Sequence, residues 1–380
     1  MKKAYFESVA LRVTRFCLFV IIFMSFSEVC FAKIDKKFRF NVGQTYDDNI
    51  TYESINKIND NITNVTAGGD LTYEGRIQSL SLGADVTHQF YVKNHNFDNT
   101  SERARGNYLL ELSKNERITL ADSFYHSFEP RSFEDEFGRL DGRYSFYNNA
   151  INFDYLRDIS KQLNLDVRYS NNMYTYSTDS ISDSYLNSGG LGLNYAINSS
   201  SIVYMNYDYS QRKFKNGPKS SKNTIAPALR QYFTRQLYAD LRPGIDFIKG
   251  YDGTKYTRAN IFLSLTNEID EATTNTFTFT KLYDTNSYTK EILDSWRCSL
   301  NFSRQLTRRL GTAITAFYGN GKYESTKTTD KMVGAAAGLT YDLTKNLKAT
   351  LNYTYSDTSS NVPTREYIRT AVTCGLRMEF

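Results

Sequence analysis

The chain is poor in the residues that build metal centres and disulfide frameworks. Its 380 residues include 4 Cys, 5 Pro, 1 Trp and 3 His, namely His88, His95 and His126. Three His are too few for a His-rich metal centre, and no two Cys stand in the CxxC spacing of a zinc site. The sequence therefore predicts no metal and no cofactor.

A dominant charge and long apolar runs are also missing. The sequence has 46 Lys and Arg against 41 Asp and Glu, with both signs mixed, and a mean hydropathy of −0.52. This mixture argues against a disordered acidic tail and against a nucleic-acid binder, which concentrates basic residues on one face. After residue 32, no apolar run approaches the roughly 18 residues of a membrane-spanning helix.

The first 32 residues differ in composition from the rest. Basic residues at Lys2, Lys3 and Arg15 precede the apolar run Phe16–Met24, and Cys30-Phe31-Ala32 follows with small residues before Lys33. This order is typical of a secretory signal peptide, and the apolar core is too short to span a bilayer of about 30 Å. We expect a cleaved signal over 1–32 and one domain over 33–380; a retained anchor is the alternative, and lipidation at Cys30 fits its context less well.

Apolar and polar residues alternate with period two along the rest of the chain. Aromatic residues make up 15% of the sequence, with 30 Tyr and 25 Phe. Runs such as Leu80–Val86, Leu163–Tyr169 and Leu347–Tyr355 carry apolar side chains at every second position. With their flanking residues the alternating stretches reach about 9–11 residues, enough for a tilted strand to cross a membrane.

The connections between these runs alternate between short and long, with nine long polar segments in all. In hydrocarbon an unpaired strand edge costs several kcal/mol, so a membrane sheet must close on itself. The pattern predicts an all-β fold: a single transmembrane up-and-down antiparallel β-barrel of about 18 strands, with both termini at the short-turn end. A soluble sandwich or propeller is the alternative. The short links are 113–116, 157–162, 198–201, 233–236, 304–309 and 342–346, and the long segments are 47–61, 93–101, 129–142, 177–184, 213–222, 250–255, 284–291, 320–330 and 356–365.

The C-terminal residues alternate up to a terminal aromatic. Phe380, Met378 and Leu376 are apolar, and charged residues stand between them. This ending resembles the last-strand signal of outer-membrane barrels, and the resemblance implies recognition by the barrel-assembly machinery. An ordinary final strand that ends at Phe is the alternative.

The opening strand resembles that of the outer-membrane β-barrel porin family of the second type. The likeness lies in Phe38–Ile50, where Tyr46-Asp47-Asp48-Asn49-Ile50 has the family's Tyr-Asp-x-Asn-hydrophobic corner. The resemblance implies a barrel linked to exopolysaccharide systems and a location in the outer membrane. It carries over no catalytic residue.

If Phe380 and its alternates face lipid, the opposite parity lines the lumen. Nine basic and nine acidic residues fall on this parity, so the wall itself predicts no ion preference. An aqueous channel fits this width of barrel. The basic residues are Arg39, Arg105, Arg168, Arg230, Arg242, Arg258, Arg297, Lys348 and Arg377; the acidic residues are Asp70, Asp85, Glu111, Asp154, Asp166, Asp208, Asp240, Asp246 and Glu379.

Two charged loops have two interpretations each. Glu134, Asp135 and Glu136 either fold inward as a negatively charged constriction, or belong to a solvated external loop, which we favour. The basic segment Arg212–Lys222 either contacts lipopolysaccharide phosphates or an acidic glycan, or is solvated, which again is the simpler interpretation. Both segments stand among the longer connections.

Three classes of function remain. A non-enzymatic channel, porin-like and serving surface-polysaccharide export, fits best, with lipid and lipopolysaccharide, the assembly machinery and export components as partners and no nucleic acid. A structural or adhesive barrel with ligand-binding extracellular loops is the alternative. An outer-membrane hydrolase fits less well; it requires a His beside a Ser nucleophile or an acid, such as His88 or His126 with Ser123 or Asp122.

Overall fold

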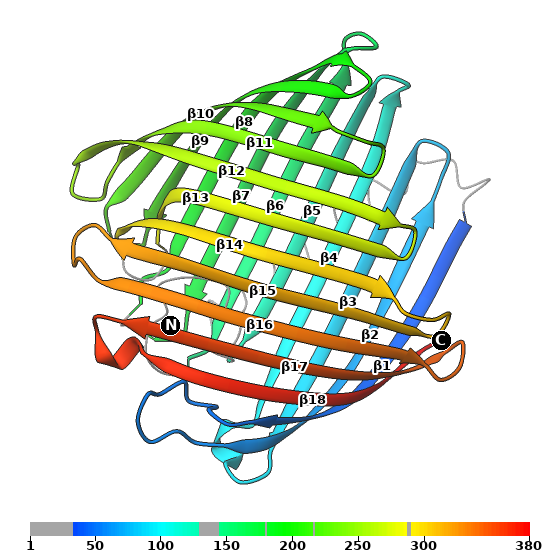
Figure 1. Cartoon of the computed structure of the whole chain (residues 1–380), viewed down its shortest axis with the longest axis vertical. Helices are drawn as coiled ribbons and strands as arrows, with labels where there is room; N and C mark the ends of the chain where they lie inside the picture. The colour runs from blue at the N-terminus through cyan, green and yellow to red at the C-terminus, as the bar shows by residue number, and fades with distance from the viewer. Residues whose placement is uncertain (1–32, 129–143, 179–180, 216, 287–289) are drawn as a thin grey trace.

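The computed structural model describes residues 33–128, 144–178, 181–215, 217–286 and 290–380, which form one closed antiparallel barrel (Figure 1). The 18-stranded all-β fold is therefore confirmed. The strands are β1 (Lys33–Asp47), β2 (Asp60–Glu74), β3 (Gln78–Tyr91), β4 (Asn99–Ser113), β5 (Glu116–Ser127), β6 (Phe146–Asp158), β7 (Leu163–Tyr176), β8 (Ser184–Asn198), β9 (Ser201–Phe214), β10 (Lys219–Tyr232), β11 (Leu237–Lys249), β12 (Lys255–Asp270), β13 (Thr273–Thr285), β14 (Ile292–Gln305), β15 (Leu310–Tyr323), β16 (Thr329–Asp342), β17 (Leu347–Ser360) and β18 (Tyr367–Glu379).

The barrel closes where the first strand meets the last. β1 pairs with β2 on one side and with β18 on the other, and we call the β1–β18 pairing the seam. Its register runs from Arg39 opposite Glu379 to Asp47 opposite Ala371. Phe38 and Phe380 then exchange two backbone hydrogen bonds of 3.0 and 2.9 Å. In Figure 1 the two strands lie side by side, in blue and red, so the sheet has no free edge along the seam.

Short turns lie at one end of the barrel and the longer connections at the other. Two of the turns were not predicted from the sequence, namely 75–77 between β2 and β3 and 271–272 between β12 and β13. Two segments expected as loops, 213–222 and 320–330, are mostly strand, because β9 and β10 leave only 215–218 between them and β15 and β16 leave only 324–328. These strand ends are polar, so they lack the alternation by which a strand is recognised.

The outward face of the barrel is mainly apolar, as the parity of Phe380 predicts. Exposed side chains at every second position include Leu191 and Leu193 on β8, and Met205 on β9. Cys298 and Cys374 share this outward parity, lie on β14 and β18, and are both free thiols. Among the described residues, no helix is long and apolar enough to cross a bilayer.

The buried apolar residues gather at the long-loop end rather than on the barrel axis. One cluster joins Ile50, Ile62 and Tyr91, which come from the β1–β2 loop, β2 and β3. Two similar clusters lie farther round the rim. They consist of Phe146, Tyr176 and Ile181, and of Ile248, Tyr283 and Ile292. These clusters pack the strand ends against the longer connections.

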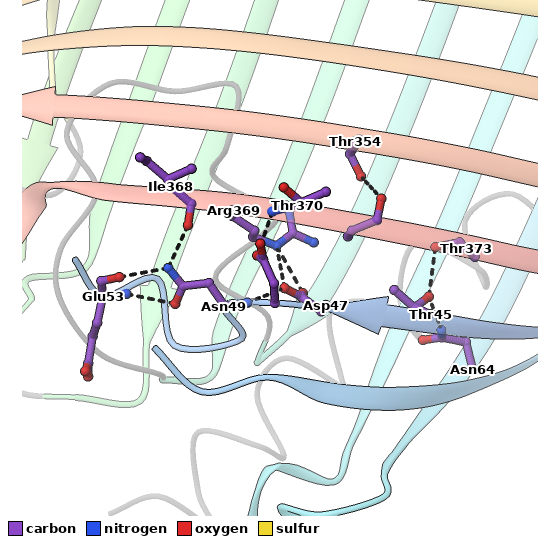
Figure 2. Close-up of polar contacts among 12 residues, drawn as sticks. Thr45, Asp47, Asn49, Glu53, Asn64, Thr354, Ile368, Arg369, Thr370 and Thr373 are labelled. Atoms are coloured by element: carbon purple, nitrogen blue, oxygen red, sulfur yellow. Dashed lines mark hydrogen bonds and ion pairs between the residues drawn. The ribbon is translucent and has the colours of Figure 1, made fainter. Parts of the chain in front are cut away.

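The Asp-x-Asn corner closes the outer end of the seam (Figure 2). Arg369 on β18 donates from Nε to both carboxylate oxygens of Asp47, at 3.1 and 3.0 Å, and both side chains are almost fully buried. Asn49 donates to the carbonyls of Glu53 and Ile368, at 2.8 and 3.0 Å. The side chains of the corner thus hold its own loop and the last strand together.

Backbone and hydroxyl contacts continue this link along the seam. The backbone N–H of Thr370 donates to the carboxylate of Asp48 at 2.7 Å, and the hydroxyls of Thr45 and Thr373 meet at 2.9 Å (Figure 2). The ring of Tyr52 lies beneath the Arg369 guanidinium, with 5.2 Å from Cζ to the ring centroid. The residues that carry the family resemblance therefore have a structural role, because they tie the first strand to the last.

Candidate functional site

Four charged side chains from four consecutive strands form one network on the inner wall. Arg39 on β1 pairs with Asp70 on β2 and, at 2.7 Å from Nη2, with Asp85 on β3. Arg105 on β4 pairs with the same two carboxylates, at 2.6 Å to Asp70 and 3.2 Å to Asp85. We call these four residues the charge box. All four stand among the lumen candidates, and the structure brings them into mutual contact.

Two glycines, which have no side chain, provide the space that the charge box occupies. A Cβ added to Gly68 would stand 2.1 Å from a carboxylate oxygen of Asp85. A Cβ added to Gly83 would stand 2.5 Å from a carboxylate oxygen of Asp70 and 2.8 Å from Nε of Arg105. Glycine in a strand costs stability, so its presence here fits the close approach of neighbouring side chains.

A second charged group lies on β7 to β9. Arg168 pairs with Asp208 at 3.2 Å and with Asp166 at 3.5 Å. It also donates to the side-chain oxygen of Asn206 at 3.3 Å. Gly190, between them on β8, gives room for this contact. As in the charge box, positive and negative groups are paired across adjacent strands.

The remaining basic lumen candidates lie next to carboxylates or aromatic rings. Arg230 forms a bidentate ion pair with Asp240, in which Nε and Nη2 each donate to one carboxylate oxygen, at 2.8 and 3.0 Å. Asp246, by contrast, accepts hydrogen bonds from the Thr224 hydroxyl and the Asn260 amide, at 2.6 and 2.7 Å. Arg258 pairs with Glu324 at 3.5 Å, Lys348 with Asp342 at 3.6 Å and Arg377 with Glu379, whereas Arg242 lies 4.8 Å from the ring centroid of Phe262 and Arg297 lies 3.8 Å from that of Phe317.

Several of these inward-facing charges are open to solvent. The side chain of Arg105 is 46% exposed and that of Asp208 is 45% exposed, although both lie on the concave face of a closed sheet. In a barrel whose interior is filled by side chains, such groups would be buried. The interior beside these strands is therefore hollow enough to admit water.

The two charged loops predicted from the sequence have different outcomes. Glu134, Asp135 and Glu136 lie outside the described residues. In the basic segment, Arg212 is buried on the inner face and donates to the hydroxyls of Ser184 and Thr285, at 3.2 and 3.3 Å.

Lys222, at the other end of that segment, donates to the carbonyl of Tyr283 at 3.0 Å. The interpretation of Arg212–Lys222 as one solvated loop is thus wrong at both ends, because the segment folds into β9 and β10. Inward-facing contacts at the rim take up these two charges.

A polar group on the outer wall was not predicted as a unit. His126 on β5 contacts Glu102 on β4 through Nδ1 and the hydroxyl of Ser145 through Nε2. The expected partners of His126 are not the ones found: Asp122 faces outward on an unbroken stretch of the β4–β5 register and accepts a hydrogen bond of 2.7 Å from Asn149. The sequence offers no signal for the true partners, because only strand register brings them together.

Comparisons with known proteins support a porin-like barrel. Residues 264–380 match the family described as "Putative beta-barrel porin 2", which confirms the family resemblance over that part of the chain. The match covers β13 to β18 and part of β12, not the Phe38–Ile50 corner. No curated protein is similar enough to the sequence to count as a match.

Solved structures share the fold at very low identity. The FrpB iron transporter from Neisseria meningitidis (F3-3 variant) is 9% identical, with a TM-score of 0.50 over 91% of this chain and 81% of that chain. The siderophore receptor PirA from Acinetobacter baumannii is 8% identical, with a TM-score of 0.51 over 91% of this chain and 80% of that one. Likeness at this level shows a barrel architecture and nothing of the cargo.

Proposed function

We propose that the chain is a passive channel of the outer membrane, because it is a closed β-barrel whose residues 264–380 match a porin family. The observation that carries this proposal is the solvent exposure of Arg105 and Asp208 on the inner wall. A wet lumen bounded by charged side chains lets small hydrophilic solutes diffuse, and passage of this kind needs no catalytic group.

The pairing of charges predicts weak ion selectivity. In the charge box two arginines face two carboxylates, so the local charges cancel. Arg168 and Arg230 are likewise next to carboxylates. A pore selects ions by uncompensated charge in a narrow opening. These matched pairs therefore support passage of both anions and cations.

Planar-bilayer recording of the purified full chain tests this proposal. We expect stepwise conductance with a reversal potential near zero in a salt gradient. Replacing Arg39 and Arg105 by Gln leaves two carboxylates without their counter-charges and should shift the pore toward cations. The double variant Asp70→Asn with Asp85→Asn should shift it toward anions. Lys213→Gln, on the outward parity of β9, is the matched control and should change nothing.

One outcome would contradict the channel, and a second would contradict the placement of the charge box along its path. Absence of any conductance from the folded protein would mean that the lumen does not conduct. Shifts of the same sign for the two double variants would mean that the charge box does not line the conducting path. Circular dichroism of each variant checks that the barrel has formed, so that misfolding is not mistaken for closure.

We extend the proposal to surface-polysaccharide export, which rests on the family resemblance alone. Deletion of the gene should then reduce the amount of polysaccharide at the cell surface, and polysaccharide should accumulate in the periplasm. The 1–32 signal peptide and recognition of Phe380, Met378 and Leu376 by the assembly machinery are parts of the same proposal. Amino-terminal sequencing of the mature protein should begin at Lys33.

A further inference from the structure

Three side chains on the outer wall form a chain of hydrogen bonds. The carboxylate of Glu102 meets Nδ1 of His126, and Nε2 of His126 meets the Oγ of Ser145 at 2.9 Å. The residues come from β4, from β5 and from the residue before β6. An acid that holds one imidazole nitrogen, with a hydroxyl at the other, is the arrangement that activates a serine nucleophile.

The group faces away from the lumen. Glu102 lies opposite Val86 on β3, and residues directly opposite each other in a sheet point to the same face. Val86 is an apolar side chain, 47% exposed on the lipid-facing wall. Arg103 and Arg105 alternate with Glu102, and Arg105 belongs to the charge box inside the barrel. Glu102 and its partners therefore lie on the membrane side.

The group also lies at the long-loop end of its strands. His126 is the last residue but one of β5, and Ser145 immediately precedes β6. The ring of Tyr147 stacks on the imidazole at 4.4 Å between centroids and 8° between planes, and the ring of Phe128 lies 5.2 Å away. Amphipathic aromatic rings on the outer face settle at the level of lipid headgroups. Ester linkages of membrane lipids occupy the same level.

Two further polar side chains lie on the same outward face, farther from the long-loop end, where an apolar wall is expected. Asp122, two rungs farther along the outward face of β5, accepts a hydrogen bond of 2.7 Å from Asn149 on β6. Ionisable groups facing lipid are costly, so their presence marks a part of the wall that does more than contact acyl chains. The polar strip formed by Asp122 and Asn149 gives a second observation, independent of the hydrogen-bonded chain itself.

We propose that Glu102, His126 and Ser145 form an esterase site that cleaves acyl esters of outer-leaflet lipids. The Oγ of Ser145 attacks the ester carbonyl and forms a new C–O bond, and its proton moves to Nε2 of His126. The ester C–O bond breaks, and the leaving alkoxide takes that proton. Water then attacks the acyl-serine through the same His, which releases a fatty acid and restores the hydroxyl.

The surroundings favour this reaction at an interface. The His126 side chain is 12% exposed and Ser145 is 6% exposed, so their hydrogen bond is kept out of bulk water, whereas the Glu102 side chain is 43% exposed. A hydrogen bond in a low-dielectric environment is stronger than one in water. This activity goes beyond the proposed channel.

Covalent labelling of the purified full chain tests the nucleophile. A fluorophosphonate probe should add its mass to Ser145 in tryptic peptides, and Ser145→Ala should remove the label. In vesicles of phosphatidylethanolamine, and separately with purified lipopolysaccharide, mass spectrometry of released fatty acids should identify which lipid class is cleaved. The variants Ser145→Ala, His126→Gln and Glu102→Gln should each lose at least about 10³-fold in release rate.

His88→Gln is the matched control. Nδ1 of this outward-facing His on β3 meets the hydroxyl of Thr100 at 2.8 Å, whereas Nδ1 of His126 meets a carboxylate. We expect its release rate to equal that of the unmodified protein. Failure of the unmodified protein to be labelled at Ser145, or fatty-acid release that survives Ser145→Ala, overturns the proposal. Conductance of each variant is measured in parallel, so loss of the channel and loss of the esterase are distinguished.

Discussion

The buried ion pair at the seam predicts a large effect of one conservative change. Asp47 is 0% exposed and Arg369 is 3% exposed. Asp47→Asn keeps the size of the side chain but leaves the Arg369 guanidinium buried without its counter-charge. Removing one partner of a buried pair costs about 3–5 kcal/mol, because the remaining charge has lost water as well as its partner.

The assay is urea unfolding of the detergent-solubilised barrel, followed by tryptophan fluorescence. With an m-value of about 3 kcal/mol/M, a loss of about 3–5 kcal/mol lowers the unfolding midpoint by roughly 1–2 M. Asp35→Asn is the matched control on the same strand. Its pair with Lys37 spans 3.6 Å, with side chains 51% and 62% exposed, and exposed pairs contribute at most about 1 kcal/mol.

A double-mutant cycle separates the pair from its surroundings. Asp47→Asn combined with Arg369→Gln removes both charges, so its cost should be well below the sum of the two single costs. Equal midpoints for Asp47→Asn and Asp35→Asn would refute the argument that the seam depends on this pair. Strict additivity in the cycle would refute a direct interaction between the two side chains.

Three further predictions concern other parts of the barrel. Gly83→Ala should disrupt the charge box and shift ion selectivity, whereas Gly189→Ala, whose added Cβ meets only a backbone atom at 3.9 Å, should not; reversal potentials decide between them. Deleting Phe380 removes two backbone bonds to Phe38 and should slow barrel assembly, measured as the rate at which heat-modifiable protein appears on gels. The spin relaxation of a nitroxide on the exposed thiol of Cys374 should be enhanced more by oxygen, which partitions into lipid, than by a water-soluble nickel complex; the reverse order would place this thiol away from the bilayer.

The strand count and the two faces were accessible from the sequence for a simple physical reason. A membrane strand must alternate between lipid and lumen, so residues such as Leu191 and Leu193 reveal both its existence and its orientation. The same rule placed Arg39 and Asp70 on one face. The alternation is lost where a strand extends beyond the bilayer, because both faces there are polar. The polar ends of β9 and β10 were therefore predicted as a loop.

The specific partners within each face were not accessible. Arg39 contacts Asp85, which is 46 positions away, and Arg369 contacts Asp47 across 322 positions. Which residues meet depends on the register between strands, and a shift of two positions keeps every side chain on its face while exchanging every partner. The same uncertainty concealed Ser145 as the neighbour of His126, since an entire connection separates them in the chain.

The seam also sets a condition on biosynthesis. Its rungs join residues as far apart as Thr45 and Thr373, which are 328 positions from each other, so closure must wait until β18 has been synthesised. Until then the edge of β1 has no partner and invites aggregation. A translation product that stops before β18 therefore cannot close its barrel.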